Sequence, residues 1–171
     1  MARYKEVELN DGRKANVYRP PTQQINAIVL KQYPEPMPPE VTEKKVTGED
    51  ITMVIKDDPA YLAQHERWEV LVNEEVNKRG ALFVFEDLEV PDDWDAETQV
   101  GDRLRAAGDT EWEPTEGPLG RKFDYIQWSI LGDMENQWIV LRAQAELSGV
   151  PMEEVQANLA SFPDQVEGPT D

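Results

Sequence analysis

The segment Asp58–Gly80, DPAYLAQHERWEVLVNEEVNKRG, carries the start and stop signals of one long helix. Asp58 is a good N-cap residue, and Pro59 occupies the first helical position, where its missing N–H costs nothing. At the other end two cations precede Gly80, and cations are favourable at the negative end of the helix dipole. We therefore predict a helix of roughly 32 Å, at about 1.5 Å per residue, that ends at Gly80.

One face of this helix is apolar, and we expect it to organise the fold. Its side chains recur at three- and four-residue spacing and are Tyr61, Leu62, His65, Trp68, Leu71, Val72 and Val76. His65 is the only histidine in the chain. Because it lies on the apolar stripe, we interpret it as a packed side chain or a rim residue and not as a catalytic group.

The N-terminal residues 3–19 predict a β-hairpin. YKEVEL and RKANVYR flank the turn residues Asn10-Asp11-Gly12, and a three-residue loop that ends in glycine is a common hairpin connection. This loop pairs Leu9 with Arg13, Val7 with Ala15, Lys5 with Val17, Glu8 with Lys14 and Tyr4 with Tyr18. The last two pairs would be one ion pair and one aromatic pair. A two-residue loop would set Val7 opposite Asn16, so the three-residue loop is favoured.

Three elements are expected between the hairpin and the long helix. Thr22 can cap a short helix over residues 23–32. Four prolines between Tyr33 and Val41 predict an extended strap, which is either a stiff spacer or a ligand for an aromatic groove. Residues 50–56 alternate apolar and polar side chains, and we expect them to add a third strand to the hairpin.

The chain after Gly80 is predicted to be mostly helical. Residues 81–90 are an apolar run that ends before Pro91, and its periodicity leaves strand and helix both open. Beyond it, an acidic loop at 109–120 interrupts a series of helices at 91–108, 121–131, 134–147 and 151–162. Residues 163–171 are expected to be a disordered tail.

Two of these helices carry further signals. Gly132 should end the helix at 121–131, and Asp133 should cap the next one. The stripe of that next helix is formed by Met134, Trp138, Leu141 and Ala145.

These elements predict an α+β fold that is predominantly α-helical, with the N-terminal hairpin packed on a bundle of five or six helices. The expected divisions are 1–57 for the hairpin, short helix and strap, 58–162 for the helical domain, and 163–171 for the tail.

The formal net charge is −18, and it is unevenly spread along the 171 residues. Residues 1–57 are neutral, so residues 58–171 carry the whole excess. Between Glu86 and Glu116 there are twelve acidic residues and two arginines. Such a field repels nucleic acid and anionic lipid and suits a basic partner, although an acidic surface can also serve solubility alone.

Catalytic and metal-binding motifs are missing from the sequence. There is no cysteine, which excludes disulfides and thiolate metal sites, and no phosphate loop, calcium loop or nucleophile elbow. The N-terminus lacks an export signal, and no apolar run is long enough to span a membrane. We therefore expect no enzymatic activity, no cofactor and no membrane or nucleic-acid partner.

Aromatic and flexible apolar side chains near the strap and the acidic segment are the candidates for partner binding. Trp112 lies within the acidic loop, where it would suit a basic amphipathic helix or fold back onto its own core. The candidate set is Trp112, Trp94, Tyr33 and Met37.

The layout of the chain resembles that of phage tail assembly chaperones, the small proteins encoded ahead of the tape-measure protein. Three passages carry the resemblance: VYRPPTQQINAIVLKQYPEPMPPEV, DPAYLAQHERWE followed by LEVPDDW, and DYIQWSILGDMENQWIVL followed by GVPMEEVQANLASF. The resemblance implies a mostly helical, non-enzymatic protein in the host cytoplasm that coats the tape-measure protein until the tail tube polymerises. A longer frameshifted form and a homo-oligomer are both left open.

Two other functions are compatible with the sequence. The chain could be a structural virion protein of the neck or tail. It could also be an acidic DNA mimic that inhibits a host defence nuclease, since the charge is so negative. Mimicry needs carboxylates spaced like phosphates on one face, whereas these acids cluster in loops and first turns.

Overall fold

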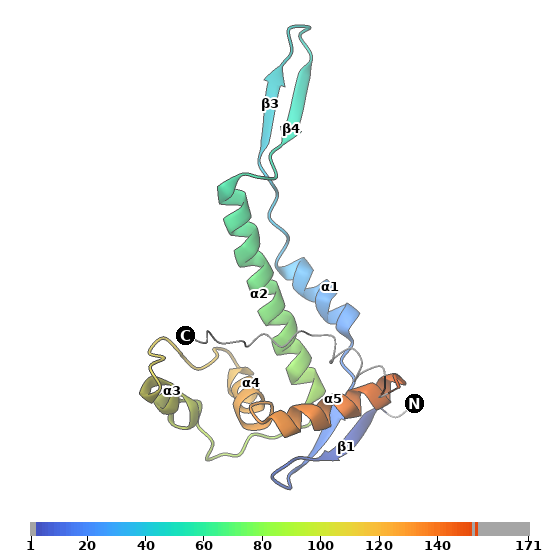
Figure 1. Cartoon of the computed structure of the whole chain (residues 1–171), viewed down its shortest axis with the longest axis vertical. Coiled ribbons are helices and arrows are strands. Elements are labelled where there is room, and N and C mark those ends of the chain that lie inside the picture. The colour runs from blue at the N-terminus through green and yellow to red at the C-terminus, as the bar shows by residue number, and fades with distance from the viewer. Residues whose placement is uncertain (1–2, 152, 154–171) are drawn as a thin grey trace, which may run out of the picture. The chain divides into compact units, whose positions relative to one another are not determined.

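The computed structural model describes residues 3–151 and 153 and divides the chain into two compact units. We call Met1–Pro20 with Ala81–Asp171 the core unit, and Pro21–Gly80 the inserted unit. Figure 1 labels the five α-helices of the described chain and strands β1, β3 and β4. The fold is α+β and mainly helical, as predicted. The divisions at residues 20 and 80 differ from the boundary expected at residue 57, because the N-terminal hairpin packs with the C-terminal half of the chain.

The N-terminal hairpin has the predicted register. Strands β1 (Tyr4–Glu8) and β2 (Lys14–Tyr18) are antiparallel, with Val7 opposite Ala15. The Leu9 N–H donates to the Arg13 carbonyl over 2.8 Å, and Gly12 adopts a φ of 82°, which a side chain would disfavour.

The structure confirms one of the two further side-chain pairs predicted for this hairpin and changes the other. The rings of Tyr4 and Tyr18 lie 5.4 Å apart, which confirms the aromatic pair. Glu8 lies opposite Lys14 as predicted, but the expected ion pair between them is wrong, since Lys14 Nζ lies 3.1 Å from the Glu6 carboxylate. The long lysine side chain therefore reaches diagonally across the strands.

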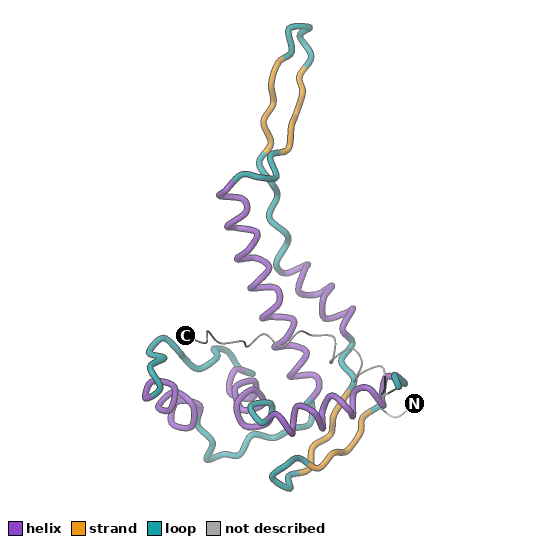
Figure 2. The backbone as a smooth tube through the Cα atoms, viewed as in Figure 1, coloured by secondary structure: helices purple, strands orange, loops and turns teal. Residues whose placement is uncertain are grey.

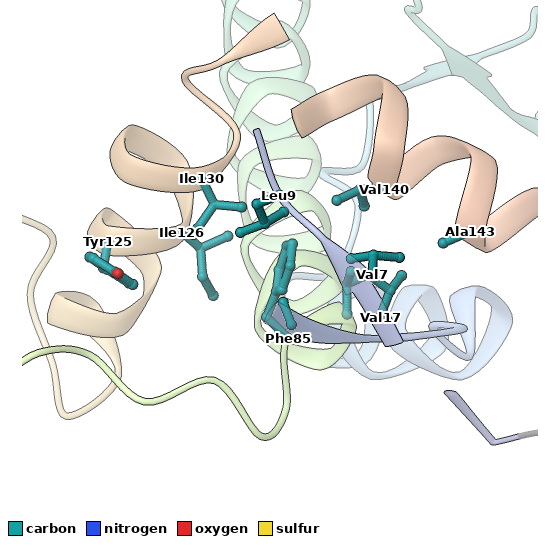
Figure 3. Packing of buried hydrophobic residues seen from close by; sticks show 11 residues of the cluster. Val7, Leu9, Val17, Phe85, Tyr125, Ile126, Ile130, Val140 and Ala143 are labelled. Atoms are coloured by element: carbon teal, nitrogen blue, oxygen red, sulfur yellow. The ribbon is translucent and has the colours of Figure 1, made fainter. Parts of the chain in front are cut away.

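The core of this unit is built between the hairpin and helices that follow residue 80. Helix α5 (Met134–Ser148) contacts both strands. Figure 3 shows Phe85 lying between Ile126 on one side and Val7 and Val17 on the other. Phe85, Ile126 and Val17 are fully buried, so this cluster joins three distant parts of the sequence.

Helix α5 starts where predicted but buries a different face. The Asp133 carboxylate accepts hydrogen bonds from the backbone N–H groups of Glu135 and Asn136, which confirms the cap. The predicted stripe is wrong except at Ala145, because the buried side chains are Asn136, Val140, Ala143 and Ala145. Met134 is 71% exposed and Trp138 is 46% exposed. Asn136 faces inward because its side-chain oxygen accepts the Asn10 N–H over 2.8 Å.

The helix predicted at 91–108 begins later. A π-helical segment, η1 (Glu97–Gly101), runs into α3 (Asp102–Ala106), and residues 91–95 are not helical. Asp95 sets the start, because its carboxylate accepts from the Thr98 N–H over 2.8 Å and from the Thr98 hydroxyl over 2.7 Å. The chain leaves the helix at Gly108, whose φ is 103°.

The helix predicted at 121–131 is present in two parts, α4 (Gly120–Tyr125) and the π-helical η2 (Ile126–Ile130). Residues 109–119 before it are non-helical, as expected for the acidic loop. The helix predicted at 151–162 and the tail at 163–171 fall almost wholly outside the described residues.

The long helix α2 (Pro59–Val84) has the predicted start but not the predicted end. The Asp58 carboxylate accepts the Tyr61 N–H over 2.9 Å, as a capping residue should. Gly80 does not stop the helix, which continues for four residues until Val84 and Phe85 are buried in the core cluster. The open question over residues 81–90 is thereby answered, since the run is a helix end followed by a turn and a loop.

The remaining elements belong to the inserted unit. Helix α1 (Thr22–Gln32) is followed by the extended strap over residues 33–39. Strands β3 (Glu40–Lys44) and β4 (Asp50–Val54) then form a second hairpin. Figure 2 shows the two strand pairs as separate hairpins. The prediction that residues 50–56 add a third strand to the first hairpin is therefore wrong. The strand is present as β4, but it pairs with β3, a strand that the sequence did not reveal.

Among the described helices, none combines the length and apolarity needed to cross a membrane.

Candidate protein-binding surfaces

The four candidate partner-binding residues are divided between the two units. Trp94 and Trp112 belong to the core unit, and Tyr33 and Met37 to the inserted unit. The structure therefore gives two pairs, and the contacts of each pair are described within its own unit.

Trp94 is part of the packing of the core unit. Its ring meets Tyr125 edge to face, with the centroids 5.3 Å apart, and it packs against the buried cluster. Its carbonyl accepts a hydrogen bond of 2.8 Å from the Arg121 guanidinium. These contacts give Trp94 a structural role.

Trp112 folds back onto its own chain. Its ring lies edge to face with Trp128 at 6.2 Å, and a Cβ added at Gly101 would lie 3.0 Å from it. Gly101 is therefore the residue that lets the acidic loop close onto η1. Trp112 is half-buried, whereas Trp128 is exposed, so the outer part of this aromatic pair is Trp128. Trp128 lies within the helix predicted at 121–131, and the sequence held no signal for this role.

The strap of the inserted unit is held along α2 at two points. The indole N–H of Trp68 donates to the Tyr33 carbonyl over 2.9 Å, and His65 Nε2 lies 3.1 Å from the Glu35 carboxylate. Tyr33 is half-buried, while Met37 is 81% exposed. Tyr33 therefore anchors the strap, and Met37 projects from it.

His65 is packed among aromatic and acidic neighbours. Its ring centroid lies 5.7 Å from that of Tyr61 and 5.2 Å from that of Trp68. Glu69 follows on the same helix face, 3.6 Å from Nδ1, and the His65 side chain is 25% exposed. The stacking and the carboxylates account for the position of this side chain without a bound substrate.

Apolar side chains are exposed over much of the inserted unit. Buried hydrophobic residues in this unit are limited to Ile25 and Val29 of α1. Its exposed large apolar residues are Ile28, Leu30, Met37, Val41, Val46, Met53, Val54, Leu62, Val70 and Leu71. Leu62 and Leu71 belong to the stripe that the sequence assigned to the core. The run Val70-Leu71-Val72 was the available signal, because three consecutive apolar residues cannot share one helix face.

The second hairpin adds an amphipathic pair of strands to this surface. Val41 lies opposite Met53, and Ile51 occupies the same face. On the other face the hydroxyls of Thr42 and Thr52 lie 3.1 Å apart. All residues of the two strands are exposed except Ile51, which is half-buried, so the apolar face is largely open.

The core unit carries most of the negative charge. Arg105, one of the two arginines between Glu86 and Glu116, is bound by Glu97 and Asp102, and the Asp102 and Glu97 carboxylates raise its pKa. Outside this segment, burial lowers the pKa of Lys122, whose ammonium donates to the Glu86 carbonyl over 2.7 Å. These cations are thus engaged within the chain, which leaves a surface rich in carboxylates.

A cleft of about 530 Å³ lies beside the first hairpin. Arg13, Lys14, Asp87 and Tyr125 are among its lining residues. Arg13 is already held by Asp11, by the Tyr125 hydroxyl and by the Ser129 carbonyl, and the Asp11 hydrogen bond raises its pKa. Within the described residues, no group of three or more histidine or acidic side chains is arranged to hold a metal ion.

The geometry therefore offers two surfaces suited to macromolecules: exposed apolar side chains on the inserted unit and carboxylates on the core unit. No known protein family, curated protein or solved structure matches this chain in the comparisons.

Proposed function

We propose that this protein is a phage tail assembly chaperone, which binds the tape-measure protein in the host cytoplasm without catalysing a reaction. The observation that carries the proposal is the inserted unit, which exposes ten large apolar side chains and buries two hydrophobic ones. Exposed apolar surface of this extent is typical of proteins that bind another chain. The resemblance noted in the sequence supplies the identity of that chain.

The inserted unit suits an amphipathic helical client. Leu62 and Val70 are exposed about two turns apart on α2. Apolar side chains on one face of a second helix could contact both of them. Met37 of the strap adds a flexible apolar side chain, which adapts to different client residues. A client built of many related helical segments would need this tolerance.

The charge of the core unit favours a basic client. Its residues account for most of the −18 net charge, and opposite charges speed and orient association. Binding should therefore weaken as salt screens the attraction, over a Debye length of about 8 Å at physiological ionic strength.

Co-expression with the tape-measure protein tests the proposal. We expect the long helical protein to remain soluble and to co-purify with this chain. The Leu62→Glu substitution should reduce the yield of the complex, because a charge is placed on the apolar face of α2. Gln64→Glu adds the same charge at another exposed position of the helix and should leave the yield unchanged.

Two results would contradict the proposal. One is a tape-measure protein that stays equally insoluble with and without this chain. The other is this chain in purified, finished virions at stoichiometric levels, measured by mass spectrometry, since a chaperone leaves before maturation and a structural protein stays.

A further inference from the structure

The second hairpin has an unsatisfied strand edge. In the described chain it is a two-stranded sheet of β3 and β4, and an isolated hairpin is marginally stable in water. Three or more strands are needed for independent stability. An additional strand at one edge would supply what this hairpin lacks.

The backbone geometry identifies which groups of β4 face outward. The Ile55 N–H donates to the Pro39 carbonyl over 2.9 Å, and the Lys45 N–H donates to the Glu49 carbonyl over 2.8 Å. Odd-numbered residues therefore form the hydrogen-bonded pairs inside the hairpin. Asp50, Thr52 and Val54 direct their N–H and C=O groups away from β3, where a further strand could bind them.

The two outer edges differ in their protection. Pro38 and Pro39 precede β3, and Lys44 and Lys45 lie at its other end. Prolines and lysines are the residues that proteins place on edges to prevent pairing. Residues 46–58, which contain β4, hold no proline, and the strand itself is rich in β-branched side chains. The open edge is thus β4.

We propose that β4 pairs antiparallel with β4 of a second copy of this chain, about a twofold axis at Met53. In this register Met53 lies opposite its symmetry mate, Ile51 lies opposite Ile55, and Thr52 lies opposite Val54. Asp50 of each copy lies opposite Lys56 of the other, which gives two cross-strand ion pairs. The outward-facing residues meet one another, as the hydrogen-bond pattern requires.

The charges select this register among the twofold alternatives. A centre at Thr52 would set Asp50 opposite Val54, and a centre at Val54 would set it opposite Asp58. Self-pairing of β3 about Thr42 would set Val41 opposite Glu43. Opposite charges and apolar pairs directly across a sheet are favourable, whereas charged–apolar and like-charge pairs are not. Of these registers, only the one about Met53 pairs an acid with a base and sets no charged residue opposite an apolar one between Asp50 and Lys56.

The dimer joins two hairpins into one four-stranded sheet through a symmetric interface, which closes at two copies. The dimer uses the backbone edge of β4, whereas the client contacts argued above lie on α2 and the strap, although Met53 and Val54 of β4 are among the ten exposed apolar residues. A failure of the dimer proposal would therefore leave the chaperone proposal in place, and the reverse also holds.

Sedimentation of the full chain tests the dimer. The wild-type protein should sediment at twice the 19.5 kDa chain mass, in a concentration-dependent equilibrium. Thr52→Pro removes an outward N–H on β4 and should raise the dissociation constant by about tenfold or more, since two symmetry-related hydrogen bonds are lost. Thr42→Pro is the matched control, because Thr42 lies opposite Thr52 and has the same exposure on the other edge.

A wild-type chain that stays monomeric would overturn the proposal, and so would equal weakening by the two prolines. The charges give a second test that does not disturb the backbone. Asp50→Lys and Lys56→Asp should each weaken the dimer, and the double variant should restore it.

A cysteine at the twofold axis tests the register itself. The chain has no cysteine, so Met53→Cys introduces a single thiol. In a non-hydrogen-bonded antiparallel pair the Cα atoms lie about 4.5 Å apart, within the range that a disulfide spans. Met53→Cys should therefore form a covalent dimer on mild oxidation, whereas Val41→Cys, its partner on β3, should not. Equal cross-linking of both variants would contradict the register.

Discussion

At the scale of single residues, Asn136 joins the first hairpin to helix α5. It is 2% exposed, and its side-chain oxygen accepts the Asn10 N–H over 2.8 Å. Asn136→Ala leaves that N–H without its partner and opens a small cavity, so we expect a loss of about 1–3 kcal/mol in the free energy of unfolding. Urea denaturation measures this. Glu135→Ala, one residue earlier and exposed, should change stability by less than about 0.5 kcal/mol, and a similar loss there would contradict the role of Asn136.

The capping residue of the same helix, Asp133, predicts that the stability of the folded protein depends on pH. The hydrogen bond from Asn10, together with the N–H groups of Asn136 and Glu135, lowers the pKa of Asp133 below 3.8. A carboxyl whose pKa is lower in the folded state stabilises the protein above its unfolded pKa, and this contribution is lost as the pH falls through the folded pKa.

The corresponding experiment compares thermal unfolding midpoints of wild type and Asp133→Asn from neutral pH to below pH 3.8. Asparagine can still cap a helix but does not titrate in this range. The variant should start with a lower midpoint and lose less of it on acidification. Parallel curves would show that Asp133 does not contribute to the acid sensitivity.

At the scale of elements, the strap is fixed to α2 by a single indole hydrogen bond and a histidine–carboxylate contact. Trp68→Phe removes the hydrogen bond to the Tyr33 carbonyl and should cost about 1 kcal/mol of unfolding free energy. The methyl group of Met37 should then sharpen in NMR spectra of methyl-labelled protein, because the strap moves more freely. Trp138→Phe, on the exposed side of α5, should leave both readouts unchanged.

Elements whose signals are local could be predicted from the sequence. The first hairpin is the best example, because the loop Asn10–Gly12 and the pairing of Val7 with Ala15 determine one register. Asp58 and Asp133 likewise identify helix starts, since a cap depends on the next three residues.

Elements decided by tertiary contacts could not be predicted. Gly80 is a good helix stop by itself, but burial of Val84 and Phe85 carries the helix beyond it. Trp138 and Met134 were expected inside because they are large and apolar, whereas the buried position is taken by Asn136, whose partner is 126 residues away. Strand β3 was missed because the prolines before it and its charged residues conceal the alternation.

The candidate binding residues show the same division. Met37 could be recognised from its place among prolines, where no helix or central strand can bury it. Trp94 and Trp112 were proposed for their acidic surroundings, but contacts with Tyr125 and Trp128 account for their positions. The run Val70-Leu71-Val72 was a signal in the sequence that Leu71 could be exposed. Leu62 had no such signal, and it can be recognised as exposed only once the neighbours of α2 are known.

At the scale of the whole molecule, buried hydrophobic residues and negative charge are both concentrated in the core unit. The core unit contains the hydrophobic cluster around Phe85 and Ile126, while the inserted unit buries Ile25 and Val29. Burial of apolar area is the main source of folding free energy. The core unit should therefore hold most of the stability of the chain, and the inserted unit should depend on its attachment or on its partners.

This difference predicts the outcome of removing the inserted unit. Tyr18, at the end of β2, donates a hydrogen bond to Asp87. The two segments of the core unit on either side of the insertion are therefore in contact. Replacing residues 21–80 by a short glycine–serine linker should thus leave a protein that unfolds cooperatively and keeps its near-ultraviolet circular dichroism. Residues 21–80 alone should show shallow, non-cooperative unfolding, because two buried hydrophobic residues cannot offset the entropy of ordering the backbone. A cooperative transition in the isolated inserted unit, or loss of folding in the excised core, would show that stability is shared between the units.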